Sequence, residues 1–136
     1  MVTRAALVLL AALALAACGS KSPKDSVKST VQSYVDGLSS QDGSKVCDQL
    51  APAVQAQVKQ RGGAKDCATA IDSFEKSATG KAVAPAFKNA SVTTVTVSGD
   101  KASAVVSVKV AGQEANTTVP LEKVDGSWKI TAAAQG

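Results

Sequence analysis

The sequence contains no histidine, and its aromatic residues are few: one tryptophan, one tyrosine and two phenylalanines. Without histidine, a cysteine nucleophile would lack its usual basic partner, and a typical four-ligand zinc site would be short of ligands. The sequence also shows no glycine-rich phosphate loop and no cluster of metal ligands, so we expect no cofactor. Most of the apolar residues are alanine and valine, which predicts a light core of small aliphatic side chains.

Runs of like charge are also missing, although the formal net charge is +4. The basic residues are scattered singly between carboxylates, and no run of five or six forms. Nucleic-acid-binding proteins usually carry such a run or patch. We therefore expect no nucleic-acid partner and interpret the charge as an ordinary solvated surface. A modest positive charge would also help a domain that lies close to anionic lipid.

One continuous apolar segment, residues 5–16, follows Arg4 near the N-terminus. At about a dozen residues it is shorter than the roughly 20 that a membrane-spanning helix needs, but it suits a signal peptide. It ends in Leu15-Ala16-Ala17-Cys18-Gly19-Ser20, which resembles a bacterial lipobox. The resemblance implies cleavage after residue 17 and two acyl chains on Cys18. We therefore expect residues 18–24 to be a short tether on the outer face of the cytoplasmic membrane.

Two further cysteines, Cys47 and Cys67, lie in the exported part of the chain. Disulfides form and persist outside the cytoplasm, so export favours a bridge between them. A zinc site and a reactive thiol are the weaker alternatives, because histidine is absent.

Three helices are predicted in the first half of the chain, over about 23–38, 44–61 and 65–79. Ser22 and Pro23 are typical of a helix start, Pro52 should kink or interrupt the second helix, and Gly80 is a plausible C-cap of the third. The predicted apolar faces are Val27, Val31, Tyr34, Val35 and Leu38; Val46, Leu50, Val54 and Val58; and Cys67, Ala70, Ile71, Phe74 and Ala78.

From about residue 90 the pattern changes to period-two alternation rich in valine and threonine. It predicts strands over about 91–98, 101–110, 114–124 and 127–131, with Asp125-Gly126 as a tight hairpin turn. Pro120 implies that the third strand lies at an edge or contains a bulge. The last strand should direct Trp128 and Ile130 inward. Three helices followed by a four-stranded antiparallel meander predict a single α+β domain over residues 25–136.

This order of elements resembles small lipoproteins of the nuclear transport factor 2-like superfamily. The resemblance rests on Tyr34 and Leu38 in the first helix, Asp42 ahead of Val46-Cys47, the hairpin Val97-Ser98-Gly99-Asp100-Lys101-Ala102 and the closing Asp125-Gly126-Ser127-Trp128-Lys129-Ile130. It implies a cone of helices on a curved sheet, and a cysteine pair joining the second and third helices suits exported members. These motifs mark helix and hairpin geometry, so they indicate the fold more than a function.

Enzymes of that superfamily commonly place an aspartate or histidine inside the cone as a general acid or base. Here histidine is absent, and most carboxylates are predicted in turns, on a solvent-facing strand surface or at helix N-termini, where they favour the helix dipole. We therefore expect no catalytic residues and a protein that is not an enzyme.

Two functions remain. In the first, the domain is an accessory module that docks on a cell-envelope protein through its sheet, on a face carrying Thr93 or Thr117. In the second, it is a carrier or sensor that holds a small apolar ligand or lipid in the cone. Four aromatic residues are the candidates for lining such a cone: Tyr34, Phe74, Phe87 and Trp128. The plainer interpretation is that these four simply fill the core. We favour the accessory module slightly from the sequence alone.

Overall fold

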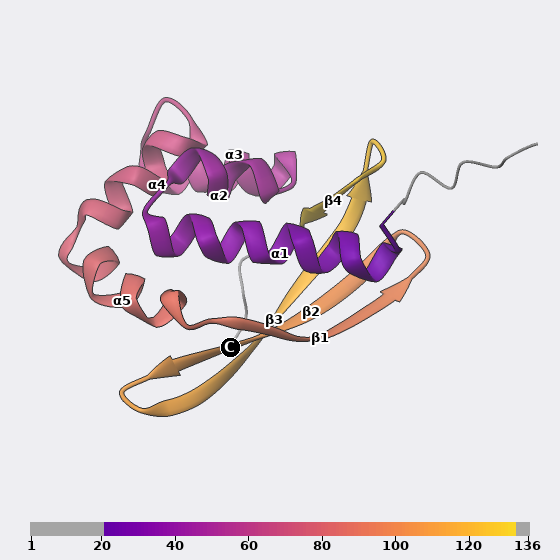
Figure 1. Cartoon of the computed structure of the whole chain (residues 1–136). Coiled ribbons are helices and arrows are strands. Elements are labelled where there is room, and N and C mark those ends of the chain that lie inside the picture. Colours follow the sequence, from indigo (N-terminus) through magenta and orange to yellow (C-terminus); the bar gives the residue numbers. More distant parts are fainter. Residues whose placement is uncertain (1–20, 133–136) are drawn as a thin grey trace, which may run out of the picture.

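A computed structural model describes residues 21–132 as five helices followed by four strands (Figure 1). The predicted signal peptide and Cys18 lie outside this range. The helices are α1 (Pro23–Ser40), α2 (Gly43–Gln49), α3 (Pro52–Gly62), α4 (Cys67–Lys76) and α5 (Ala78–Lys88). The strands are β1 (Ser91–Ser98), β2 (Lys101–Val110), β3 (Gln113–Val124) and β4 (Ser127–Ile130). The predicted α+β class is confirmed.

The predicted number of three helices is wrong, although the interruption expected near Pro52 is present. The second predicted helix is divided into α2 and α3 at Leu50 and Ala51, where the backbone N–H of Ala51 donates to the Ile130 carbonyl at 2.8 Å. This hydrogen bond turns the chain toward the sheet just before Pro52, which then occupies the first position of α3.

The third predicted helix ends at Lys76, and the unpredicted α5 follows almost at once. Ser77 is both the C-cap of α4 and the N-cap of α5. Its Oγ accepts a hydrogen bond from the Gly80 N–H at 3.1 Å, so Gly80 lies in the first turn of α5 and does not cap α4. The glycine and Pro85 inside α5 hid this helix from a propensity-based prediction.

The four strands form one antiparallel sheet in the order β1-β2-β3-β4. The predicted tight turn between β3 and β4 is confirmed, because Asp125 and Gly126 both have positive φ angles, 49° and 81°. The edge expected at Pro120 is present only locally: β3 lies between two strands in the sheet order, but within the described residues its pairing with β4 covers only Leu121–Val124. The expected bulge is absent there, because the register with β2 is continuous from Val110↔Gln113 to Lys101↔Glu122.

Pro120 is tolerated there for a local reason. Its carbonyl accepts a hydrogen bond from the Thr131 N–H at 3.0 Å, on the side of β4. The N–H and C=O of one residue in a strand point to the same side, so the nitrogen of Pro120 also faces β4. Proline has no N–H to donate back to Thr131, and the pairing of β3 with β4 ends at this point, at Leu121↔Ile130.

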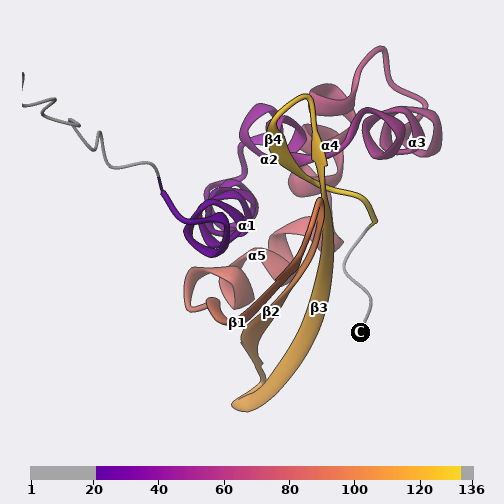
Figure 2. The same ribbon diagram turned by 90° about the vertical axis from the view of Figure 1, so that its right-hand side faces the viewer.

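Figure 2 shows the sheet nearly edge-on, with α1 and α5 on one side of it and α2, α3 and α4 gathered near the end where β4 lies. Helix α1 packs against β1, β2 and β4, while α5 packs against β2. The core between these layers is light, as predicted, and its side chains lie between Val27 and Ile130 in the sequence. A chain that begins at Gly19 therefore retains every core residue that the structure describes. The largest of the fully buried side chains are Val27, Val31, Val46, Val119 and Ile130.

Candidate functional site

A pocket of about 290 Å³ lies between α1, α4 and α5. Most of its wall is apolar, and six of its eight lining residues come from α1 and α5. The lining residues are Tyr34 and Leu38 of α1, Phe74 and Glu75 of α4, and Gly80, Val83, Ala84 and Phe87 of α5. We call this the helical pocket.

Two large apolar side chains at the helical pocket are open to solvent: Phe74 is 49% exposed and Val83 is 40% exposed. Among residues 21–132, Val110 is the other large hydrophobic residue with comparable exposure, 54%, and it lies at the end of β2. Single exposed hydrophobic residues are common on protein surfaces, but neighbours that share a concave wall are typical of binding sites.

A second, smaller cavity of about 130 Å³ lies behind the helical pocket, against the sheet. Tyr34 and Phe87 line both spaces and form the boundary between them. Thr117 is on the wall of this inner cavity, so it does not belong to an outward docking face of the sheet, whereas Thr93 is exposed. The other lining residues of the inner cavity are Val35, Val106, Val108 and Val119.

Glu75 is the unusual member of the helical pocket. Its side chain is only 4% exposed, and within residues 21–132 neither of its carboxylate oxygens has a hydrogen-bond partner. Buried polar atoms are nearly always hydrogen-bonded in folded proteins, because leaving them unpaired costs free energy. Burial, and then the negative charges of Asp72 and Asp42, raise the pKa of Glu75 from 4.5 to about 6.

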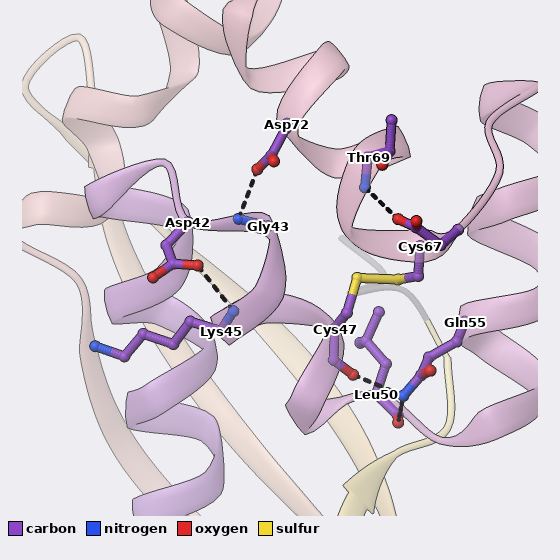
Figure 3. Close-up of a disulfide and its surroundings, with 10 residues drawn as sticks. Asp42, Gly43, Lys45, Cys47, Leu50, Gln55, Cys67, Thr69 and Asp72 are labelled. Carbon is purple, nitrogen blue, oxygen red and sulfur yellow. Dashed lines mark hydrogen bonds between the residues drawn. A yellow bond between two sulfur atoms is a disulfide. The ribbon is translucent and has the colours of Figure 1, made fainter.

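Hydrogen bonds hold the helix that carries Glu75 against the turn between α1 and α2. The Gln41 side chain donates to the Glu75 backbone carbonyl at 2.8 Å, and the Asp72 carboxylate accepts from the Gly43 N–H at 2.9 Å. Figure 3 shows this second contact, together with Asp42, which caps α2 by accepting from the Lys45 N–H at 3.0 Å. The two aspartates are thus occupied as structural acceptors, and their negative charges contribute to the raised pKa of Glu75.

The disulfide predicted between Cys47 and Cys67 is present, with an S–S distance of 2.02 Å and a Cα–Cα distance of 6.1 Å (Figure 3). It joins α2 to the first residue of α4. Together with the contacts of Gln41 and Asp72, it fixes the position of α4 and therefore of one wall of the helical pocket.

The junction between α4 and α5 closes the wall on the other side. Gly80 is buried against the end of α4, where an added Cβ atom would lie 2.6 Å from the Cα of Glu75. Real Cβ atoms do not approach other carbons so closely, so this crossing requires glycine. The close approach sets Val83, Ala84 and Phe87 opposite Tyr34 and Leu38.

Of the four aromatic residues predicted to line a cone, the structure brings Tyr34, Phe74 and Phe87 together at the helical pocket. Trp128 lies elsewhere: it points into the core from β4, as predicted for that strand, and the Lys123 ammonium lies 5.8 Å from its ring centroid. Phe74 is not a core residue, although helical spacing placed it on the inner face of its helix. Cys18 lies outside the described residues.

Sequence reasoning missed Glu75, although a signal was present. Glu75 follows Ile71 by four residues and Cys67 by eight, which places all three on one face of α4. A carboxylate on the apolar face of an amphipathic helix is unusual, because glutamate is rarely buried without a partner, and it indicates a candidate functional residue. The burial of Tyr34, which raises the pKa of its phenol, is consistent with the prediction that it faces inward.

In the part of the chain that the structure describes, no group of three or more His, Cys, Asp or Glu side chains is placed to hold a metal ion. None of the helices in residues 21–132 combines the length and apolar character needed to cross a membrane.

The helices packed on one face of a curved antiparallel sheet define a nuclear transport factor 2-like (NTF2-like) fold. The chain belongs to the family described as "Putative lumazine-binding", which matches residues 22–134. The resemblance to the NTF2-like superfamily seen in the sequence is therefore confirmed. No curated protein matches the chain.

Solved structures also resemble this chain. A protein from Campylobacter jejuni, named a "Putative NTF2-like transpeptidase", superposes with a TM-score of 0.53 at 17% identity, covering 83% of this chain and 100% of that one. An NTF-2 like protein of unknown function from Shewanella oneidensis MR-1 gives a TM-score of 0.48 at 14% identity, covering 81% and 95% of the two chains. At such low identity the Campylobacter protein shows a shared fold and nothing about activity.

Proposed function

We propose that this protein is a lipid-anchored, extracytoplasmic binding protein that holds a small, largely apolar ligand in the helical pocket. The observation that carries the proposal is the solvent exposure of Phe74 and Val83 on the wall of a mostly apolar cavity of about 290 Å³. Ligand pockets of proteins usually begin at about 300 Å³, so the expected ligand is small, of one or two fused rings or a short acyl chain. The protein acts by binding and not by catalysis.

The family supports a ligand of this size. Its description names lumazine, a flat bicyclic molecule, and the wall of the helical pocket offers the rings of Phe74, Phe87 and Tyr34 to such a molecule. Aromatic side chains contact flat ligands over a large apolar area and add preferred stacking geometries. The inner cavity of about 130 Å³ behind Tyr34 and Phe87 gives these two rings room to move when a ligand enters.

Binding is tested on the chain Gly19–Gly136, purified from the exported fraction without detergent. Native and denatured masses are compared to detect a retained molecule, and a fluorescent naphthalene probe is then titrated into the protein. Phe74→Ala should weaken probe binding at least several-fold, while Val110→Ala, which removes an exposed side chain that does not line the pocket, should leave it unchanged. Equal effects of the two substitutions, or no binding by the unmodified chain, would refute the proposal.

Membrane anchoring is tested separately. The lipobox-like segment before Cys18 supports attachment of acyl chains at that residue. Cells producing the full chain are fed a radiolabelled fatty acid, and the labelled protein should be found in the membrane fraction. Cys18→Ala should abolish both the label and the membrane association. Label that persists in this variant would show that anchoring at Cys18 is wrong.

Docking on an envelope protein is the second candidate, because the exposure of Phe74 and Val83 would also suit a protein contact. The two candidate functions differ in which side chains the bound molecule would contact. A partner would cover both side chains from outside and leave the inner side chain of Phe87 unaffected, whereas a ligand would contact Phe87 directly.

A further inference from the structure

The unpartnered carboxyl of Glu75 is the feature that the proposed function leaves unexplained. An apolar ligand alone would make no use of it, and a glutamate buried without a partner destabilises the folded protein. Sites that bind small molecules usually combine an apolar wall with one or a few polar groups that select and orient the ligand. Among the described residues that line the helical pocket, Glu75 is the one acidic residue.

We propose that Glu75 binds a protonated amine, so that the ligands of this protein are small apolar molecules carrying one cationic nitrogen. This inference rests on the proposed function, because it names the ligand class of the same pocket. The nitrogen donates to the Glu75 carboxylate while the apolar body of the ligand contacts Phe74, Phe87 and Tyr34. Both carboxylate oxygens are shielded from solvent, so a rotation of the Glu75 side chain toward the cavity accompanies binding.

The charges around Glu75 favour a cation over an anion. Asp72 on its own helix and Asp42 in the turn after α1 both add negative potential at the carboxyl. From α1 the facing side chains are Tyr34 and Leu38, and α5 contributes Gly80, Val83, Ala84 and Phe87. No lysine or arginine within residues 21–132 belongs to this wall, and Lys81 of α5 lines a separate hollow beside Ser39 and Gln41.

The same environment gives the binding a pH dependence. An ionised Glu75 pairs with an ammonium group, whereas the protonated acid does not, so affinity for an amine should fall as the pH drops through about 6. Binding of an uncharged ligand with the same apolar body should not fall over this range.

Three probes of matched shape test the inference on the chain Gly19–Gly136: naphthalenemethylamine, naphthalenemethanol and naphthoate. At pH 7.5 the amine should bind most tightly and the carboxylate least. Glu75→Gln should weaken amine binding by roughly ten-fold or more, as expected for loss of a charge-assisted hydrogen bond, and should leave the alcohol nearly unchanged. Glu122→Gln, a substitution at an exposed position on β3, is the matched control and should change neither.

The outcomes separate this inference from the proposed function. Amine preference that disappears in Glu75→Gln supports both. Equal affinity for amine and alcohol, with binding still sensitive to Phe74→Ala, overturns the inference and leaves an apolar ligand-binding protein. No binding of any probe overturns the two together.

Discussion

Replacing Glu75 with glutamine should make the folded protein more stable at neutral pH, although it removes a charged residue. The substitution keeps the size of the side chain and replaces a buried carboxylate by a neutral amide. In the folded protein the pKa of Glu75 is about 6, and the ordinary value of 4.5 applies to the unfolded chain. The folded protein therefore binds the proton more tightly than the unfolded chain does.

The sign of the pH dependence follows from this difference. Below pH 4.5 the carboxyl is protonated in both states, so it costs the folded protein nothing. As the pH rises through about 6, the folded protein must carry a buried negative charge, and the free energy of unfolding falls. Since one pH unit of pKa difference corresponds to about 1.4 kcal/mol, the rise from 4.5 to about 6 corresponds to roughly 2 kcal/mol.

The absence of histidine makes this prediction easy to measure. Histidine is the side chain that ordinarily titrates between pH 5 and 8, so here the change in that window should come mainly from Glu75. Urea unfolding is followed from pH 4.5 to 7.5 for the unmodified chain and for Glu75→Gln. The variant should gain up to about 2 kcal/mol at pH 7.5 and show a flatter pH profile.

Glu122→Gln is again the control, because Glu122 is exposed and its loss should leave the pH profile unchanged. If Glu75→Gln and the unmodified chain lose stability in parallel between pH 4.5 and 7.5, then Glu75 is not buried without a partner. The inference built on its carboxyl would then have no structural basis.

Changes at the disulfide, at Gly80 and at Val31 test the stability of the domain that holds the pocket, with an exposed valine as the control. Reducing the disulfide, or changing both Cys47 and Cys67 to serine, should lower the free energy of unfolding in urea by about 3 kcal/mol, as expected for the loop they close. Gly80→Ala should lower the free energy of unfolding by roughly 2 kcal/mol or more, because the added Cβ would collide with the end of α4. A smaller loss of stability, measured by thermal unfolding, would mean that α4 and α5 cross less tightly. Val31→Ala, at a side chain with no solvent exposure, should cost roughly 2 kcal/mol, whereas Val110→Ala at an exposed strand end should change stability by less than about 0.5 kcal/mol.

Local patterns were sufficient to predict the sheet and the first helix. Alternating valine and threonine, with turn residues at Gly99 and at Asp125-Gly126, predicted the four strands, and each predicted strand end lies within one residue of the observed end. Ser22 caps α1 as expected, accepting from the Asp25 N–H at 3.2 Å. These features depend on neighbours in the sequence, which is why they could be read without the structure.

The pocket could not be predicted in the same way, because it depends on how helices cross. The presence of α5 follows from the double capping role of Ser77, which no local propensity reveals. Whether Phe74 or Glu75 is buried depends on where α5 crosses α4, and the close contact at Gly80 fixes that crossing. Helical spacing placed both residues near the inner face, and the tertiary contact decided between them.

The most direct test of ligand binding in the helical pocket uses the aromatic side chains as reporters. The sequence has one tyrosine and two phenylalanines, and all three line this pocket, while the single tryptophan lies in the core away from it. We would record aromatic NMR spectra of the chain Gly19–Gly136 during titration with naphthalenemethylamine. Saturable shifts of the Tyr34, Phe74 and Phe87 signals with an unchanged Trp128 signal are the predicted result. Shifts centred on Trp128, or none at Phe87, would contradict the account.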